Sequence, residues 1–173
     1  MNPAQAFFSE TSTPDNPKLE FVFEIRLHFT RVQNIHHMPT GAGRGAVYLD
    51  SGEIKGPRLN GRAVPNSGGD YALFRPDDVL AFDARYMLEA DDGALILMYN
   101  RGYLWGRNPD TMQKMHAWVH KTGPAVPANE YYFRNFPTFE VDAGPHDWLM
   151  RHVIVGVGHR EDDGNRIRYY ALL

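Results

Sequence analysis

The chain has 173 residues, carries a formal net charge of −3 and contains no cysteine. Its length suits one ordinary domain with a core of its own, and its charge gives no electrostatic reason to expect nucleic acid or an anionic membrane as a partner. The lack of cysteine excludes disulfides, a thiolate nucleophile and cysteine-ligated metal centres.

Residues 1–18 are polar and punctuated by proline, so we predict a flexible N-terminal arm followed by a single domain over residues 19–173. The arm lacks the basic start and apolar run of a signal peptide. No apolar stretch of the chain approaches the ~20 residues that a membrane-spanning helix needs. We therefore expect a cytoplasmic protein without a membrane partner.

From residue 19 onward, apolar and polar residues alternate with the period of a β-strand. The apolar positions of this first strand are Phe21, Phe23, Ile25, Leu27 and Phe29. The glycine-rich segment that follows is cut into short strands, which we predict at residues 45–50, 53–55 and 59–64. It ends in the stretch NSGGDY at residues 66–71.

A β-hairpin is predicted next, because strands over residues 79–89 and 94–101 are joined by Asp91-Asp92-Gly93. One face of its first strand is apolar. The residues of that face are Leu80, Phe82, Ala84, Tyr86 and Leu88. Asp83 and Arg85 point to the opposite face.

Residues 111–121 predict the one convincing helix, within an excursion over residues 104–129 that we expect to form a lid. Its predicted apolar underside consists of Trp105, Met112, Met115 and Trp118. Strands resume at residues 130–136, 148–159 and 166–173. So many strands with one short helix would leave an apolar sheet face uncovered unless the sheet closes. We therefore predict an all-β fold: a single closed antiparallel β-barrel, lipocalin-like or allene-oxide-cyclase-like.

The order of short motifs along the chain is similar to that of a known family. The motifs are Gly56-Pro57, Leu59, Gly61, Pro65, Gly68-Gly69-Asp70-Tyr71, Asp83-Ala84-Arg85-Tyr86, Asp92-Gly93-Ala94, Ile96, Asn100-Arg101-Gly102-Tyr103, Tyr131-Tyr132-Phe133-Arg134, Pro137, Phe139-Glu140, Trp148-Leu149 and Val155. Over residues 19–173 the chain resembles the bacterial and fungal "domain of unknown function 3237" proteins. Tyr71 and the RPDD of residues 75–78 stand where that family usually has Trp and Asp-Gly. The resemblance implies a small antiparallel barrel and a cytoplasmic small-molecule protein, and it implies no particular reaction.

Asp70 is the first candidate catalytic residue. A carboxylate beside two glycines fits at the mouth of a barrel, and aromatic neighbours such as Tyr71 and Phe74 would raise its pKa toward the range of a general acid or base. Alternatively, the aspartate caps a turn through its own side-chain hydrogen bonds.

Arg85 and Arg134 are candidates to stabilise an oxyanion. For Arg85 this role requires the polar face of its strand to line the lumen or a subunit interface. In the alternative interpretation that face lies in solvent, and Arg85 forms a weak surface ion pair with Asp83.

Further side chains are candidates for binding a substrate, because aromatic and arginine side chains suit an apolar anion or enolate, although the same pairs also stack for purely structural reasons. These candidates are Tyr86, Asn100, Arg101, Tyr103, Trp105, Trp118 and Tyr132. His116 and His120 have metal-ligand spacing, but no Glu follows His116 as in HExxH, and an exposed helix face is the preferred interpretation. We predict no metal and no cofactor.

The predicted function is that of a cofactor-independent enzyme acting by proton transfer on a hydrophobic carbonyl compound, aromatic or polyketide-like. Isomerisation, cyclisation and lyase-type elimination all fit, with Asp70 moving the proton and with Tyr86 and Tyr103 orienting the substrate. One alternative is a non-catalytic carrier barrel for a similar ligand. Another is a structural barrel filled by its own side chains. A homodimer is a further expectation.

Overall fold

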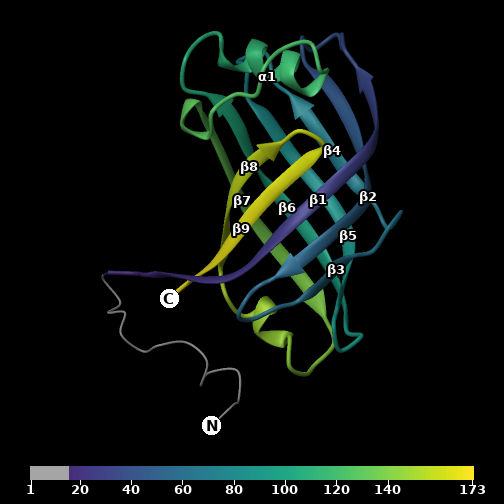
Figure 1. The fold of residues 1–173 in the computed structure, drawn as a ribbon, viewed down its shortest axis with the longest axis vertical. Helices are drawn as coiled ribbons and strands as arrows, with labels where there is room; N and C mark the ends of the chain where they lie inside the picture. Colours follow the sequence, from purple (N-terminus) through teal and green to yellow (C-terminus); the bar gives the residue numbers. More distant parts are fainter. Residues whose placement is uncertain (1–15) are drawn as a thin grey trace.

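The strands of this chain form one antiparallel sheet that closes on itself (Figure 1). The structure is a computed structural model and describes residues 16–173. In chain order, the strands are β1 (Leu19–Ile35), β2 (Gly43–Lys55), β3 (Gly61–Ala63), β4 (Gly69–Phe74), β5 (Leu80–Ala90), β6 (Leu95–Gly106), β7 (Tyr131–Val141), β8 (Ile154–Glu161) and β9 (Gly164–Leu172). The predicted closed antiparallel β-barrel is thereby confirmed.

The strand order is β1-β9-β8-β7-β6-β5-β3-β2-β4, with further pairings of β1 to β2 and of β5 to β4 that close the ring. Both β3 and β4 pair with β2 and with β5. The short strands β3 and β4 therefore lie end to end between β2 and β5 and together count as one strand of the barrel. The nine strands thus form an eight-stranded barrel.

The observed strand ends differ from the predicted ones where the alternation of apolar and polar residues weakens or where a strand bends. β1 runs on to Ile35, past register shifts near Phe29, and pairs with β2 as one long ribbon. The segment predicted as a strand from residue 148 begins instead with a short 3-10 helix (Asp147–Met150), and β8 starts at Ile154. Of the predicted arm, residues 1–15 lie outside the described part of the chain.

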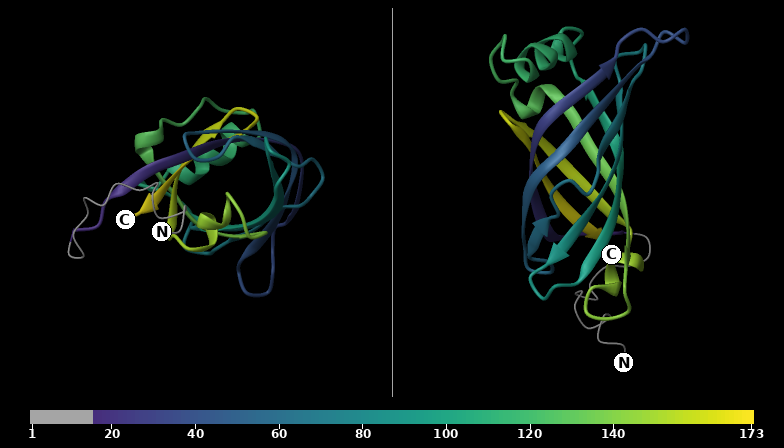
Figure 2. Two further views of the ribbon diagram at one scale, coloured as in Figure 1. Left: turned by 90° about the horizontal axis from the view of Figure 1, so that it is seen from below. Right: turned by 90° about the vertical axis from the view of Figure 1, so that its right-hand side faces the viewer.

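The two ends of the barrel are covered differently (Figures 1 and 2). The only α-helix of residues 16–173, α1 (Thr111–Val119), lies over one end, and a 3-10 turn (Ala128–Glu130) leads from it into β7. At the opposite end the 3-10 helix after β7 buries Trp148 and Leu149 against the core. The barrel is thus plugged at one end by packed side chains.

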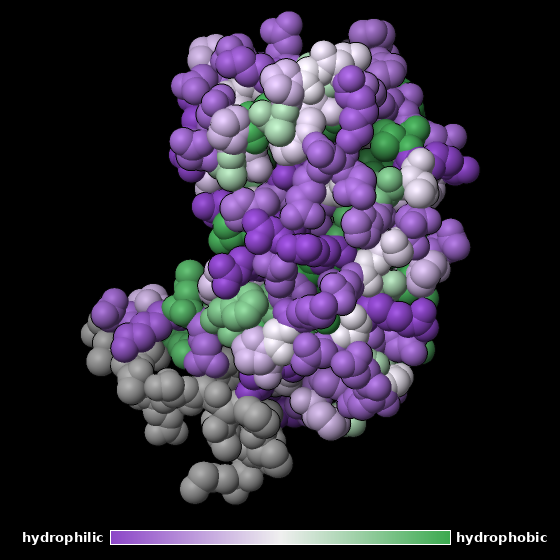
Figure 3. Space-filling view, viewed as in Figure 1, coloured by the Kyte–Doolittle hydropathy of each residue, from purple (hydrophilic) through white to green (hydrophobic). Residues whose placement is uncertain are grey.

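Strand alternation separates the interior from the surface. Inward residues of β1, β5, β6 and β9 form one apolar core, with Phe23, Leu88, Met98 and Tyr169 fully buried. Polar residues cover most of the outer face seen in Figure 3, with apolar residues scattered between them. Within residues 16–173, no helix has the length and apolar character needed to cross a membrane.

Candidate functional site

The Gly68-Gly69 pair lets β4 enter the wall between β2 and β5. A Cβ on Gly68 would lie 1.9 Å from the backbone oxygen of Arg85, and one on Gly69 would lie 2.5 Å from that of Val47. A side chain at either position would push the neighbouring strand away. The NSGGDY stretch is therefore the tightly packed start of β4. The glycine pair within it fixes the orientation of the residue that comes after the pair.

Asp70, the residue after this pair, points into the barrel and is the only carboxylate lining the small cavity described below. Its Oδ1 accepts a hydrogen bond of 2.9 Å from the backbone N–H of Asp83. This bond falls where the β4–β5 pairing is interrupted, between Asp70↔Ala84 and Leu73↔Ala81. Burial raises the pKa of Asp70 to about 7; the Asp83 N–H bond opposes this shift, and the charge of Asp83 adds to it.

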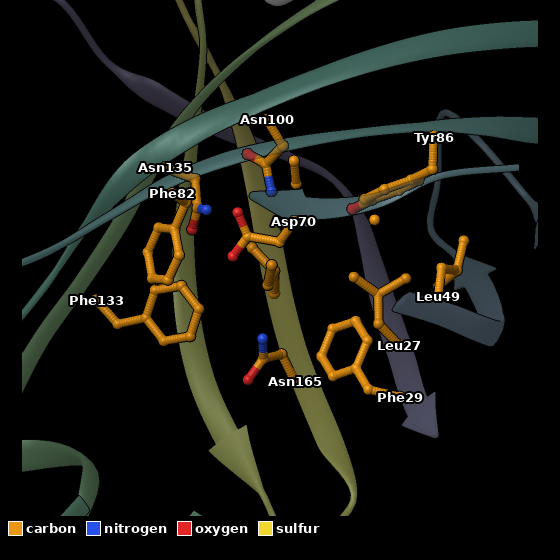
Figure 4. Close-up of a pocket in the computed structure, with 13 residues that line it drawn as sticks. Leu27, Phe29, Leu49, Asp70, Phe82, Tyr86, Asn100, Phe133, Asn135 and Asn165 are labelled. Atoms are coloured by element: carbon orange, nitrogen blue, oxygen red, sulfur yellow. The ribbon is translucent and has the colours of Figure 1, made fainter. Parts of the chain in front are cut away.

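Uncommitted polar groups surround this carboxyl (Figure 4). Asn100 donates from Nδ2 to the hydroxyl of Tyr169 at 3.0 Å. Within the described chain, the Oδ1 atoms of Asn100 and Asn135 and the hydroxyl of Tyr86 are buried without a hydrogen-bond partner. Burial raises the pKa of Tyr86 and the nearby Asp70 adds to that effect, while the adjacent Asn100 side chain opposes it, and the phenol stays protonated. The floor of the barrel therefore offers donors and acceptors that the fold itself does not use.

Two neighbouring spaces share Asp70 as a lining residue. The lower one is a cavity of about 30 Å³, room for roughly one water molecule, between the asparagines and Tyr86. The upper one is a cavity of about 930 Å³ that reaches from Asp70 to α1 and opens between the strand ends. The residues that line both are Phe29, Asp70, Phe82, Phe133 and Asn165. A space of this size accepts a drug-sized molecule.

The walls of the upper cavity are mainly apolar, and α1 forms part of them. The apolar lining consists of Val47, Ala72, Phe74, Leu80, Leu104, Met112, Met115 and Val119 together with the shared phenylalanines. Met112 and Met115 thus occupy the place predicted for the underside of the lid. Charged and polar residues also line this cavity, among them His116, His120, Lys121 and Arg160.

Trp118, predicted to bind substrate, is buried and ties the helix to the barrel. Its Nε1 donates to Oδ1 of Asp162 at 2.8 Å, and Lys121 bonds the backbone oxygen of the same aspartate. Asp162 lies in the turn between β8 and β9. The rings of His116 and His120 lie 4.3 Å apart on the exposed side of the helix, and no group of metal-ligating residues large enough to hold an ion exists in residues 16–173.

The structure does not bring the remaining predicted residues into the lumen, because each lies at an outward position of its strand. Arg85 is exposed, pairs with Asp83 at 3.4 Å and lies over the Tyr99 ring. The surface interpretation of Arg85 therefore matches its position. Arg101 and Tyr103 are exposed as well.

A stack on the outer wall accounts for three more of the predicted residues. The rings of Trp105 and Tyr132 lie 5.1 Å apart, and the guanidinium of Arg134 lies 5.1 Å from the Tyr132 ring. Trp105 is thus outside the barrel and does not form part of a lid. Tyr103 and Phe136 extend this aromatic surface, where a homodimer contact stays a prediction.

Sequence analysis missed several lumen residues: Asn135, Asn165, Arg160 and the phenylalanines of the cavity wall. For Asn135 a signal existed, since it lies at the alternate position after Tyr131 and Phe133. For Arg160 the alternation of apolar and polar residues gave no signal that it points inward, because the inward positions before it are the glycines Gly156 and Gly158.

These features define a small, closed antiparallel β-barrel with an internal apolar cavity and a single carboxyl at its floor. The chain belongs to the family described as "Protein of unknown function (DUF3237)", whose model matches residues 17–172. This confirms the resemblance found in the sequence.

Relatives cover most of the chain. The UPF0311 protein of Rhodopseudomonas palustris strain TIE-1 is 32% identical over 149 residues, which is 85% of this chain and 92% of the relative. A UPF0311 protein of Clostridium acetobutylicum is 32% identical over 129 residues, 75% of this chain and 77% of the relative.

Solved structures share the barrel. A protein of unknown function from Clostridium acetobutylicum superposes with a TM-score of 0.79 at 27% identity, covering 91% of this chain and 98% of the other. A conserved protein of unknown function from Rhodopseudomonas palustris superposes with a TM-score of 0.80 at 28% identity, covering 94% of this chain and 100% of the other. An enzyme from Penicillium herquei superposes with a TM-score of 0.66 at 20% identity, covering 96% of this chain and 100% of the other, and at that identity the likeness shows the fold alone.

Proposed function

We propose that this protein is a cytoplasmic, cofactor-independent enzyme that moves a proton on a hydrophobic carbonyl compound, with Asp70 as its general acid or base. The reaction class is isomerisation, cyclisation or a lyase-type elimination. The observation that supports the proposal is the position of Asp70. One carboxyl stands at the junction of a polar floor and a large apolar cavity, where a bound molecule would contact it.

The environment of Asp70 suits this work. A general acid–base catalyst is most effective when its pKa lies near the operating pH, and burial raises the pKa of Asp70 to about 7. Its bond from the Asp83 N–H leaves the second carboxylate oxygen for a substrate. Aromatic walls exclude water from the reacting atoms, which strengthens electrostatic interactions there.

Oxyanion stabilisation falls to Asn100 and Asn135, since Arg85 and Arg134 lie on the outer face. Both amides are buried beside Asp70, and the atom of each that lacks a hydrogen-bond partner is its oxygen, an acceptor, while Nδ2 of Asn100 donates to the Tyr169 hydroxyl. An amide presents either its oxygen or its NH₂ group to a ligand by turning about one bond. A developing enolate between Asp70 and these amides would receive a hydrogen bond in a site of low dielectric.

The competing function is a carrier of small hydrophobic molecules. The cavity of about 930 Å³ favours this alternative as much as it favours an enzyme, because binding alone requires no titratable group. The two functions differ in what happens to an acidic C–H of the bound ligand. Only the enzyme exchanges that proton with solvent.

The experiment is a deuterium-exchange screen. A panel of enolisable aryl ketones and lactones is incubated with the protein in D₂O, and deuterium uptake at the α-carbon is followed by proton NMR. We expect uptake with wild type and a loss of at least about 100-fold in Asp70→Asn. Asp142→Asn removes an exposed carboxylate outside the barrel and serves as the control. Ligands that bind without uptake, or uptake that persists in Asp70→Asn, would contradict the proposed function.

A further inference from the structure

Arg160 is a charged residue inside the barrel whose position the proposed acid–base chemistry does not explain. It lies near the end of β8, at the inward position that follows Gly156 and Gly158, and it lines the upper cavity together with Asp70. Its Nη1 donates to Oδ1 of Asn165 at 3.2 Å. Asn165 in turn lines both cavities, so a hydrogen bond links Arg160 to a residue that also lines the small cavity beside Asp70.

The guanidinium is poorly compensated. Its Nε is buried without a hydrogen-bond partner, and none of the ion pairs found within residues 16–173 includes Arg160. Arginine stays protonated in proteins, so this is a cation held partly out of water. Such a charge is costly unless an anion approaches it.

Two acidic residues that follow Arg160 closely in the chain, Asp162 and Asp163, have other partners. Oδ1 of Asp162 accepts the Trp118 indole N–H at 2.8 Å, and Oδ2 of Asp163 lies 3.1 Å from Nδ1 of His28. Burial lowers the pKa of Arg160, and the charges of Asp163 and Asp162 only partly oppose that shift, without forming an ion pair with the guanidinium. Lys121 and the two helix histidines also line the upper cavity, and Lys121 lies near the same turn, since it bonds the backbone oxygen of Asp162.

We propose that Arg160 binds an anionic group with at least two oxygens, a carboxylate or a sulfonate, of the molecule that occupies the upper cavity. The ligand class is then a hydrophobic acid whose charged end lies at Arg160 and whose apolar body lies between Phe29, Phe82 and Phe133. An arginine fork matches a carboxylate with paired hydrogen bonds and so fixes orientation as well as charge.

This inference rests on the proposed function in one respect: it explains how a substrate is turned so that its reacting carbon meets Asp70. The anion site itself is a matter of binding. It is therefore tested without any turnover, and its outcome stays separate from that of the deuterium-exchange screen.

The test compares two fluorescent probes of nearly equal shape, the anion anilinonaphthalenesulfonate and its uncharged parent N-phenylnaphthylamine. Titrations give the dissociation constant of each for the wild type and for Arg160→Gln. We expect the substitution to weaken the anion by about 10- to 100-fold, the range for a charge-assisted pair, and the neutral probe by less than about twofold. Arg107→Gln removes a positive charge on the outer wall and should change neither probe.

Two results would overturn the proposal: an equal change for both probes in Arg160→Gln, or no change for either. If circular dichroism shows that Arg160→Gln does not fold, the role of Arg160 is tested instead with Arg160→Lys. It keeps the charge and loses the planar fork, so the anion should weaken by about three- to tenfold while the neutral probe is unchanged. Equal affinities of wild type and Arg160→Lys for the anion would then refute the role of the guanidinium.

Discussion

Replacing Asp70 by asparagine should change how the stability of the protein depends on pH. The amide keeps the shape of the carboxyl and can still accept the hydrogen bond from the Asp83 N–H, but it cannot ionise. The pKa of Asp70 is raised from 3.8 to about 7 in the folded protein, so the folded state binds its proton more tightly than the unfolded chain does. The contribution of Asp70 to stability is therefore fully present below pH ~4 and is lost as the pH rises through about 7.

The magnitude follows from the two pKa values. Each pH unit between them corresponds to about 1.4 kcal/mol, so ionisation of the buried carboxyl costs up to about 4 kcal/mol above pH ~7. Asp70→Asn escapes this cost. At pH ~8.5 we expect the variant to be more stable than wild type by up to that amount, whereas at pH ~4 the two should be nearly equal.

The assay is urea denaturation followed by tryptophan fluorescence at several pH values between about 4 and 9. The quantity of interest is the difference in free energy of unfolding between wild type and Asp70→Asn, because all other titrating groups cancel from it. Asp142→Asn, on the exposed loop after β7, should show no such trend. A difference that does not vary with pH would show that the Asp70 carboxyl is not destabilised as an anion, and the acid–base role would lose its basis.

Three further predictions concern the wall, the helix and the outer face. Gly68→Ala should destabilise the protein by roughly 3 kcal/mol or more in urea denaturation, because its Cβ would fall on the Arg85 carbonyl; a loss below about 1 kcal/mol would contradict the tight entry of β4. Trp118→Phe should cost about 1 kcal/mol and speed amide exchange in α1, since the bond to Asp162 is lost; unchanged protection of α1 by mass spectrometry would argue against this tie. Under the proposed acid–base function, Arg85→Ala should leave deuterium uptake within about twofold of wild type, and a large loss would mean that the outer face takes part.

Period-two alternation was sufficient to predict the barrel, because inward and outward residues of long strands are distinguished by their polarity. It also placed Tyr86 inside and Arg85 on the opposite face. Applied to β6, the same rule places Asn100 inside with Met98 and excludes Arg101 from the lumen, since adjacent residues of a strand cannot share a face. Grouping Asn100 and Arg101 in one site ignored this constraint.

In β7 the alternation itself was uninformative. Tyr131 and Phe133 face the core, while Tyr132 and Phe136 lie on the outer wall, so aromatic residues occupy both faces. The sequence could not show which set was buried. The Asp83 N–H bond to Asp70 and the Trp118 bond to Asp162 depend on strand register and on the packing of α1, which neighbouring residues do not determine.

Trp148 and Leu149, which fill one end of the barrel, determine how a ligand can enter and leave the lumen. A lumen sealed at one end has a single doorway, so a molecule that reaches Asp70 and the molecule that departs must use the same path past α1. For the enzyme that we propose, product and substrate would exclude each other in turn, and the product would act as a competitive inhibitor. The rate of product release past α1, rather than the chemical step at Asp70, would then set the upper limit on turnover.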